Sequence, residues 1–230
     1  MNVASKIGTG AGAFDGSGDY LSLATGDQAI WNWNTGAYTV EGWISTTSRA
    51  SQFIWHGAGN ANTTGFRVRV QTDGKINANE QVSGDHQFIG TTDVADGAWH
   101  HWAVSREAAG DAKLFVDGVH EATNDANYNT DNTNEQYIGM KYGGNEPFDG
   151  YMDEMRVSKV ARYTTGFTPS TTAFKDDKDT VLLLHMDGGG GIDPTTNLPI
   201  LTGQGTYFWD ASTLSLIHIS EPTRPRRLSY

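Results

Sequence analysis

The chain has 230 residues, of which 37% are hydrophobic and 11% aromatic, enough to build a packed core in one large domain or two small ones. Its formal net charge of −11 argues against binding to nucleic acid, which needs clustered Lys and Arg, and favours a cation as partner. Cysteine is absent, which excludes disulfides and thiolate sites. No stretch reaches the roughly 18 apolar residues of a membrane span, so we expect no membrane insertion.

Short strands joined by tight turns are favoured by 28 glycines and by many Asn, Asp and Thr residues. Alternation is clearest in "FRVRVQ" (66–71), whose apolar and polar residues fall on opposite faces before a turn at Asp73-Gly74. A second hairpin turn is predicted at Asp117-Gly118, after "LFV" (114–116). In chain order the other predicted strands are residues 38–46, 52–56, 86–91, 99–106, 137–141, 151–157 and 180–186.

The spacing of these strands decides the fold class. No long segment has a 3.6-residue period, and only residues 158–164 suggest a helical turn, so folds with helical crossovers are excluded. The sequence predicts an all-β, two-sheet antiparallel jelly-roll sandwich. Residues 167–179, rich in Pro, Thr and charge, have the composition of a surface connection and mark the one visible internal boundary.

Six phrases, in order along residues 13–174, resemble the laminin-G-like, concanavalin A-like jelly-roll family, in the version common in phage and bacterial surface repeats. They are "AFDGSGDYLSL" (13–23), "AYTVEGWI" (37–44), "DGAWHHWAVSR" (96–106), "LFVDGV" (114–119), "IGMKYGGNEPFDGYMDEMRVS" (138–158) and "ARYTTGFTPSTTAF" (161–174). Their order and spacing make the set specific. The resemblance implies a concanavalin A-like fold and a location on an extracellular surface or a virion.

The resemblance also implies a domain organisation. "TVLLLHMDG" (180–188) is similar to the opening of a repeat unit, yet here it follows the rest of the domain. We expect a laminin-G-like jelly roll at 1–176, then a closing strand and the start of a following repeat at 177–213, whose strand fills an open sheet edge on its own domain or on a neighbouring molecule. Residues 214–230, with "LSLIHISEPTR", resemble translated read-through of a sequencing adapter and are expected to be a non-native tail.

Catalytic carboxylates were sought because laminarinase-type hydrolases share the jelly roll. Such enzymes need two carboxylates about 5.5 Å apart, at alternating positions of one strand. Neither Glu-x-Asp-x-x-Glu nor Glu-x-Asp-x-Glu occurs, Asp153 and Glu154 are adjacent and should point to opposite faces, and Glu41 is alone in its strand. His100 and His101 are adjacent too, lack a third zinc ligand, and are interpreted as ordinary strand residues. The sequence therefore predicts no enzyme.

Calcium is the metal that suits a chain rich in side-chain oxygens. By resemblance to concanavalin A-like domains, which often hold a structural Ca²⁺ through an Asp of this strand, Asp153 is the expected ligand, with Asp187 as a second if the following strand pairs beside it. An Asn-rich loop offers Asp125, Asp131 and Glu135 as another site, without the EF-hand spacing. The alternatives are that Asp153 hydrogen-bonds a neighbouring turn and that the loop is a solvated connection.

Sugar binding usually needs an exposed aromatic ring to stack on a pyranose, with polar groups to orient the hydroxyls. The candidate ligand-binding residues are Trp31, Trp33, Tyr128, Tyr142 and Asn145. The alternative for the two tryptophans is that they cap an edge of the sandwich.

These features favour a non-catalytic carbohydrate-binding and adhesion module of a larger surface or phage-tail protein. Its expected partners are a glycan or cell-surface polysaccharide and neighbouring repeats, not nucleic acid. The alternative hypothesis is a structural spacer or virion decoration repeat without a small ligand, and a glycoside hydrolase is the third.

Overall fold

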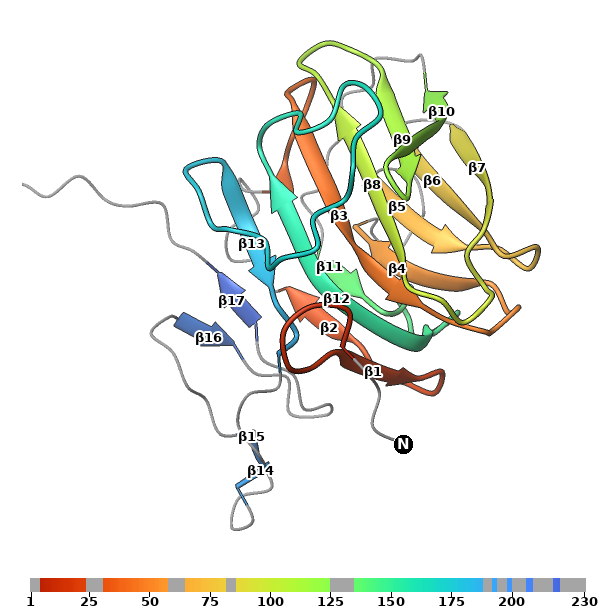
Figure 1. Cartoon of the computed structure of the whole chain (residues 1–230), viewed down its shortest axis with the longest axis vertical. Coiled ribbons are helices and arrows are strands. Elements are labelled where there is room, and N and C mark those ends of the chain that lie inside the picture. The colour runs from red at the N-terminus through yellow and green to blue at the C-terminus, as the bar shows by residue number, and fades with distance from the viewer. Residues whose placement is uncertain are drawn as a thin grey trace, which may run out of the picture.

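In the computed structural model, the described residues are 5–23, 31–57, 65–81, 86–124 and 135–187, with the short strands β14 (Ile192–Asp193), β15 (Leu198–Pro199), β16 (Thr206–Phe208) and β17 (Ile217–Ile219). Every element with described bounds is a β-strand. Two antiparallel sheets stack face to face (Figure 1), which confirms the predicted all-β jelly-roll sandwich. In this part of the chain no helix has the length and apolar character needed to cross a membrane.

The first sheet has seven strands. Six follow the order β1-β12-β3-β8-β9-β10, and β13 pairs with β12. Their bounds are β1 Gly12–Asp15, β3 Tyr38–Ser45, β8 His100–Arg106, β9 Ala112–Val116, β10 Val119–Asn124, β12 Asp149–Ser158 and β13 Thr180–Leu184. β1 pairs with residues 149–152 and β13 with residues 155–158, so the predicted strand after residue 180 is present and pairs with a strand of its own chain.

The second sheet has six strands in the order β2-β11-β4-β5-β6-β7. Their bounds are β2 Leu21–Leu23, β4 Gln52–His56, β5 Gly65–Val70, β6 Lys75–Gln81, β7 Gln87–Asp93 and β11 Gln136–Ile138. Both predicted hairpins are confirmed, β5 to β6 and β9 to β10. Asp117 and Gly118 have φ of 49° and 79°, the left-handed pair that an Asp-Gly turn tolerates.

The core lies between the two sheets. The alternating apolar residues of segment 66–70 point into it, as predicted, beside fully buried Trp55 and Trp102. One ion pair crosses this interior: the guanidinium of Arg106 in β8 lies 2.7 Å from the carboxylate of Glu80 in β6, and both side chains are fully buried. The sheets are therefore joined by a charged contact as well as by apolar packing.

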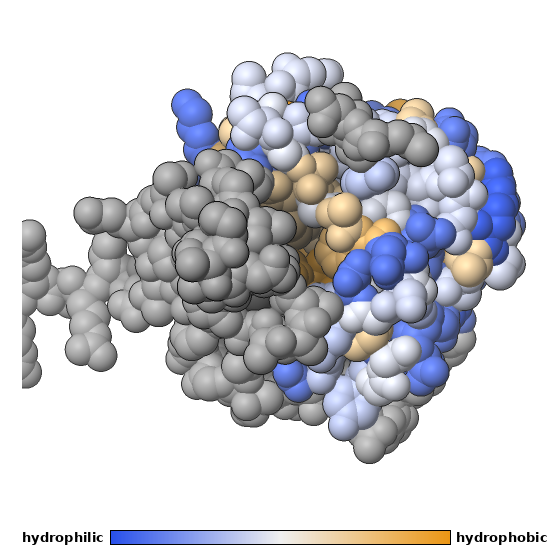
Figure 2. Space-filling model, turned by 90° about the horizontal axis from the view of Figure 1, so that it is seen from below, coloured by the Kyte–Doolittle hydropathy of each residue, from blue (hydrophilic) through white to orange (hydrophobic). Residues whose placement is uncertain are grey.

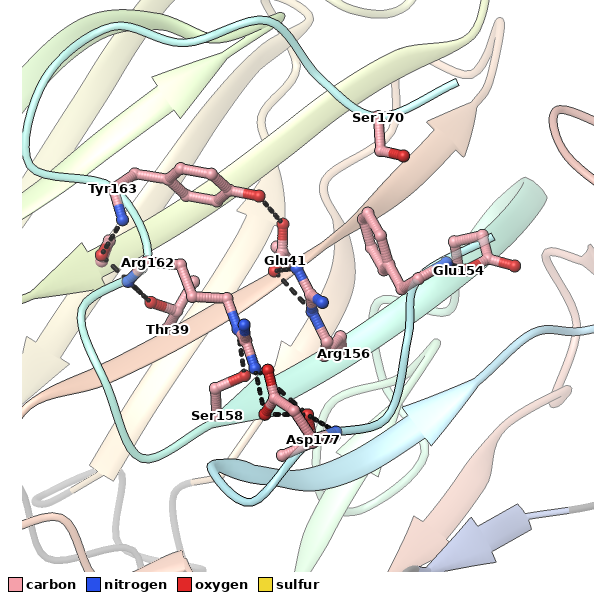
Figure 3. A network of polar contacts seen from close by, with 12 residues as sticks. Thr39, Glu41, Glu154, Arg156, Ser158, Arg162, Tyr163, Ser170 and Asp177 are labelled. Atoms are coloured by element: carbon pink, nitrogen blue, oxygen red, sulfur yellow. Dashed lines mark hydrogen bonds and ion pairs between the residues drawn. The ribbon is translucent and has the colours of Figure 1, made fainter. Parts of the chain in front are cut away.

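The outer face of the first sheet is covered by residues 159–179, which we call the strap (Figure 1). Its Tyr163 and Phe167 rings stack with centroids 3.5 Å apart, and its Phe174 ring lies 4.2 Å from the guanidinium of Arg156. Beneath the strap, buried Glu41 accepts hydrogen bonds from Arg156 at 2.6 and 2.8 Å and from the Tyr163 hydroxyl at 2.7 Å (Figure 3). The helical turn suggested at 158–164 is absent, because these residues end β12 and begin the strap.

Figure 2 shows the molecule from below, the end of the sandwich at which β1 lies in Figure 1. Seen from below, apolar residues gather in a hollow near the centre and hydrophilic residues border them (Figure 2). Met186, just after β13, packs against the core beside β1, and a Cβ on Gly12 would lie 3.2 Å from its sulfur. A larger residue at position 12 would thus require the Met186 side chain to shift by a few tenths of an ångström.

Candidate functional site

Two rows of side chains run across the outer face of the second sheet. In the first row successive register partners are Tyr137, His56, Arg67, Asn79 and Gln87. In the second row they are Phe53, Arg69, Asn77 and Ile89. None of the nine belongs to the core cluster, whereas neighbours such as Val68 and Phe88 do, so the rows face away from the core. We call these nine residues the polar rows.

Contacts within the polar rows link adjacent strands. The Gln87 Oε1 atom accepts a hydrogen bond from the Asn77 amide and, at 3.5 Å, one from Arg69. The Phe53 ring has two cations near it, the Arg69 guanidinium carbon and the Lys141 Nζ atom, each 5.9 Å from the ring centroid. The face thus combines amide, guanidinium and aromatic groups.

Three tyrosines form a cluster at one end of the first row. The Tyr137 ring lies 5.9 Å from the Tyr20 ring and 5.8 Å from the Tyr142 ring, between centroids. Burial and then the hydrogen bond to Glu135, 2.6 Å long, raise the pKa of Tyr137 far above its usual value, which keeps its hydroxyl a donor. Tyr142 is 38% exposed, so one ring of the cluster faces solvent.

The exposed tyrosine lies on a tight hairpin. The backbone N–H of Lys141 donates to the carbonyl of Asn145 at 3.0 Å, closing the turn. Gly143 and Gly144 between them have φ of 85° and 82°, a conformation that glycine adopts without steric cost. The predicted ligand residues Tyr142 and Asn145 therefore lie on one exposed loop.

Glu146 fixes this hairpin to β4. Its carbonyl accepts the Phe53 N–H at 3.0 Å, and its carboxylate accepts the Ser51 hydroxyl at 2.5 Å. The same carboxylate forms an ion pair with Lys141 at 3.4 Å. The hairpin is thereby held beside the second polar row, which contains Phe53.

The prediction that Trp31 and Trp33 bind a ligand is wrong. They are only 2% and 5% exposed, because Trp31 packs against Trp55 with ring centroids 5.8 Å apart and Trp33 stacks on Tyr38 at 4.3 Å. Both belong to the core, in line with the alternative that they cap the sandwich. Predicted residue Tyr128 lies outside the described residues.

The two carboxylates expected to hold calcium anchor the segment 5–10 instead. The Asp153 Oδ2 atom accepts the backbone N–H groups of residues 6–7 at 3.0 Å each. The Asp187 Oδ1 atom accepts those of residues 9–10 at 2.6 and 3.1 Å. Backbone N–H groups repel a cation, and among the described residues no three His, Cys, Asp or Glu side chains are grouped to hold a metal.

The described residues thus bring two carboxylates to this place, fewer oxygen ligands than calcium takes, and the Asp153 Oδ1 atom is buried there without a hydrogen-bond partner. The second calcium option is not assembled in the described residues either. Glu135 accepts the Tyr137 hydroxyl, and Asp125 and Asp131 lie outside the described residues.

A β-bulge in β12 overturns the expectation that Asp153 and Glu154 face opposite sides. The register of β12 with β3 shifts between Asp153 and Arg156, and Glu154 has a φ of 50°. Met152 and Met155, on either side of the pair, both belong to the core. Asp153 and Glu154 therefore both point away from the core.

The bulge carboxylates hold covering segments in place. Glu154 accepts the Phe174 N–H of the strap at 2.6 Å and pairs with His185 at 2.7 Å, which raises the pKa of that imidazole. Burial, and then the charges of Glu154 and Asp187, raise the pKa of Asp153 to about 6, although the Ile7 N–H opposes them. These carboxylates thus bind groups of their own chain.

The polar rows were not predicted from the sequence. Alternation placed Arg67 and Arg69 on the polar face of one strand, without aligning them with His56, Asn79 and Gln87 of other strands. The available signal was a pair of polar residues at alternating positions in β5 (Arg67, Arg69) and in β6 (Asn77, Asn79). Aligning the residues of the polar rows across the sheet needs the pairing register of the strands. A single sequence does not determine that register where a loop longer than a tight turn joins two strands.

A family model described as the concanavalin A-like lectin/glucanases superfamily matches residues 15–165. Among solved structures, a candidate carbohydrate-binding protein from Bacteroides ovatus is 20% identical with a TM-score of 0.60, and the match covers 92% of this chain and 58% of that one. The CBM40 module of a Ruminococcus gnavus sialidase is 17% identical with a TM-score of 0.56, covering 70% and 95%. It has also been solved with α2,3-sialyllactose and α2,6-sialyllactose.

Domains LG4-5 of the mouse laminin α1 chain are 18% identical with a TM-score of 0.52, covering 74% of this chain and 48% of that one. No curated protein matches significantly. At these identities the solved structures show the fold alone, whereas the family model spans more than half of the sequence. The chain therefore belongs to the concanavalin A-like lectin/glucanases superfamily.

Proposed function

We propose that this chain is a non-catalytic carbohydrate-binding module whose glycan site is the outer face of the second sheet, beside the Tyr142 hairpin. One observation carries the proposal: an exposed tyrosine adjoins the polar rows, in which Arg67, Arg69, Gln87 and Ile89 reach the surface while the other five side chains are buried. A stacking ring beside convergent polar groups is the arrangement that sugar recognition requires.

The similar proteins support this proposal. The Bacteroides ovatus protein is described as a candidate carbohydrate-binding protein, and the CBM40 module was solved with sialyllactose bound. This chain spans only 58% of the Bacteroides ovatus protein. We therefore also propose that it is one module of a larger extracellular or phage-tail protein, next to neighbouring repeats, and that this larger protein acts in adhesion.

The distribution of carboxylates argues for binding without catalysis. The polar rows contain no Asp or Glu, so they offer neither an acid nor a nucleophile for glycoside cleavage. Glu41, Asp153 and Glu154 lie on the first sheet, fully buried and hydrogen-bonded to other parts of their own chain.

Replacing Tyr142 with alanine is expected to weaken glycan binding about tenfold, because it removes the exposed ring of the tyrosine cluster. The fold should be unaffected, since the side chain is exposed and its contact with Tyr137 is peripheral. A glycan array followed by titration calorimetry of the best sugar gives the measurement. Tyr142→Phe is the matched control, and its binding should stay close to wild type because the ring remains.

A folded protein that binds no glycan would contradict the proposal and favour the alternative, a structural spacer or virion decoration repeat. Full binding by Tyr142→Ala would place the sugar elsewhere on the module.

A further inference from the structure

Building on the proposed function, we infer that this module selects acidic saccharides, and that the Arg69 guanidinium binds their carboxylate or sulfate group. The inference concerns the chemical class of the glycan and a residue that determines specificity.

The charge on the polar rows is opposite to that of the whole chain. The protein has 27 acidic residues against 16 Lys and Arg. The nine residues of the polar rows include the partly exposed Arg67 and Arg69 but no Asp or Glu. A partly exposed guanidinium on an acidic protein attracts an anionic ligand to its own position, whereas the acidic remainder of the surface repels that ligand.

Arg69 differs from four other arginines of this domain. Arg49, Arg106, Arg156 and Arg162 each form an ion pair with a carboxylate at 2.6 to 2.8 Å. Within the described residues Arg69 has no carboxylate partner, and its contacts are the neutral Gln87 amide at 3.5 Å and the Phe53 ring. Its fork of N–H donors is therefore available for the bidentate contact that a carboxylate or sulfate accepts.

The position of Arg69 places its charge near the stacking residue. Its guanidinium carbon and Lys141 Nζ each lie 5.9 Å from the Phe53 centroid, so they are at most 11.8 Å apart. Lys141 is paired with Glu146 and immediately precedes Tyr142 in the hairpin. A saccharide stacked on Tyr142 can thus extend toward Arg69, whose guanidinium pairs with no carboxylate among the residues that the structure describes.

The test compares saccharides that differ in charge. Three pairs serve: sialyllactose with lactose, oligogalacturonate with its methyl ester, and a sulfated galactan with its desulfated form. Wild-type protein should bind the acidic member of at least one pair about tenfold tighter than the neutral one, as expected for a charge-assisted hydrogen bond. That preference should weaken as NaCl is raised, because the site is partly exposed. The selective pair identifies carboxylate or sulfate as the group bound.

Arg69→Gln should abolish the preference, whereas Arg49→Gln, which removes the same charge from an exposed ion pair with Asp93, should preserve it. Arg69→Lys, which keeps the charge but loses the fork, should give an intermediate affinity. Two results would overturn the inference and leave the proposed function standing. One is equal binding of acidic and neutral sugars at low and at high NaCl; the other is an unchanged preference for the acidic sugar in folded Arg69→Gln. Failure to bind any saccharide would reject both.

Discussion

Replacing Arg106 with methionine should lower the free energy of unfolding by about 3–5 kcal/mol, because it leaves the Glu80 carboxylate buried without its cation. Glu80 also accepts the Tyr38 hydroxyl at 2.6 Å and the Asn124 amide at 3.2 Å, and those donors do not supply a full positive charge. For a domain of this size the loss corresponds to a decrease in melting temperature of roughly 10 °C. Urea unfolding followed by tryptophan fluorescence gives the measurement.

Two controls separate the buried charge from lost packing. Arg49→Met removes an arginine from an ion pair with Asp93 whose side chains are about half exposed, and should cost less than about 1 kcal/mol. The double variant Arg106→Met with Glu80→Leu removes both charges and should recover much of the loss. If the single variant Arg106→Met proved as stable as Arg49→Met, the ion pair would not be a link between the sheets.

The fold class could be predicted from the sequence because each strand and each turn has a local residue pattern that identifies it. The alternation in residues 66–70 and the Asp117-Gly118 turn depend on neighbouring residues alone, and both are present as predicted. Trp31 and Trp33 illustrate the limit: aromatic residues outside predicted strands looked available, but long-range packing buries them.

The bulge at Asp153 and Glu154 shows a second limit. Strict alternation places adjacent residues on opposite faces of a sheet. At the bulge, where Glu154 has a positive φ, two adjacent side chains point to the same face instead. The alignment of the polar rows depends on the register of five strands, β11, β4, β5, β6 and β7, which is set by loops and pairing partners. Tyr142 and Asn145 were predictable because a Gly-Gly turn marks an exposed hairpin in the sequence itself.

Replacing Asp153 with asparagine should stabilise the protein at pH 7.5, by about 1–2 kcal/mol. Burial and neighbouring carboxylates raise the folded-state pKa of Asp153 to about 6, above the value of about 3.9 expected in the unfolded chain. Between these values the folded state binds more protons, so the free energy of unfolding falls as pH rises from about 4 to 6. The penalty is complete above about pH 7, and an asparagine, which does not titrate, avoids it while its carbonyl still accepts the N–H groups of residues 6–7.

The free energies of unfolding of the wild type and of Asp153→Asn, measured at pH 4 and pH 7.5, test this pH dependence. The greater stability of Asp153→Asn at pH 7.5 should nearly vanish at pH 4. Asp177→Asn is a control of opposite sign, because hydrogen bonding from Arg162 lowers the pKa of Asp177 and its loss should destabilise the protein at pH 7.5. The same measurements with CaCl₂ or EDTA decide the role of Asp153. If it anchors residues 6–7, calcium leaves the stability unchanged; if calcium stabilises the wild type and Asp153→Asn removes that effect, the carboxylate is a metal ligand and the anchor interpretation is wrong.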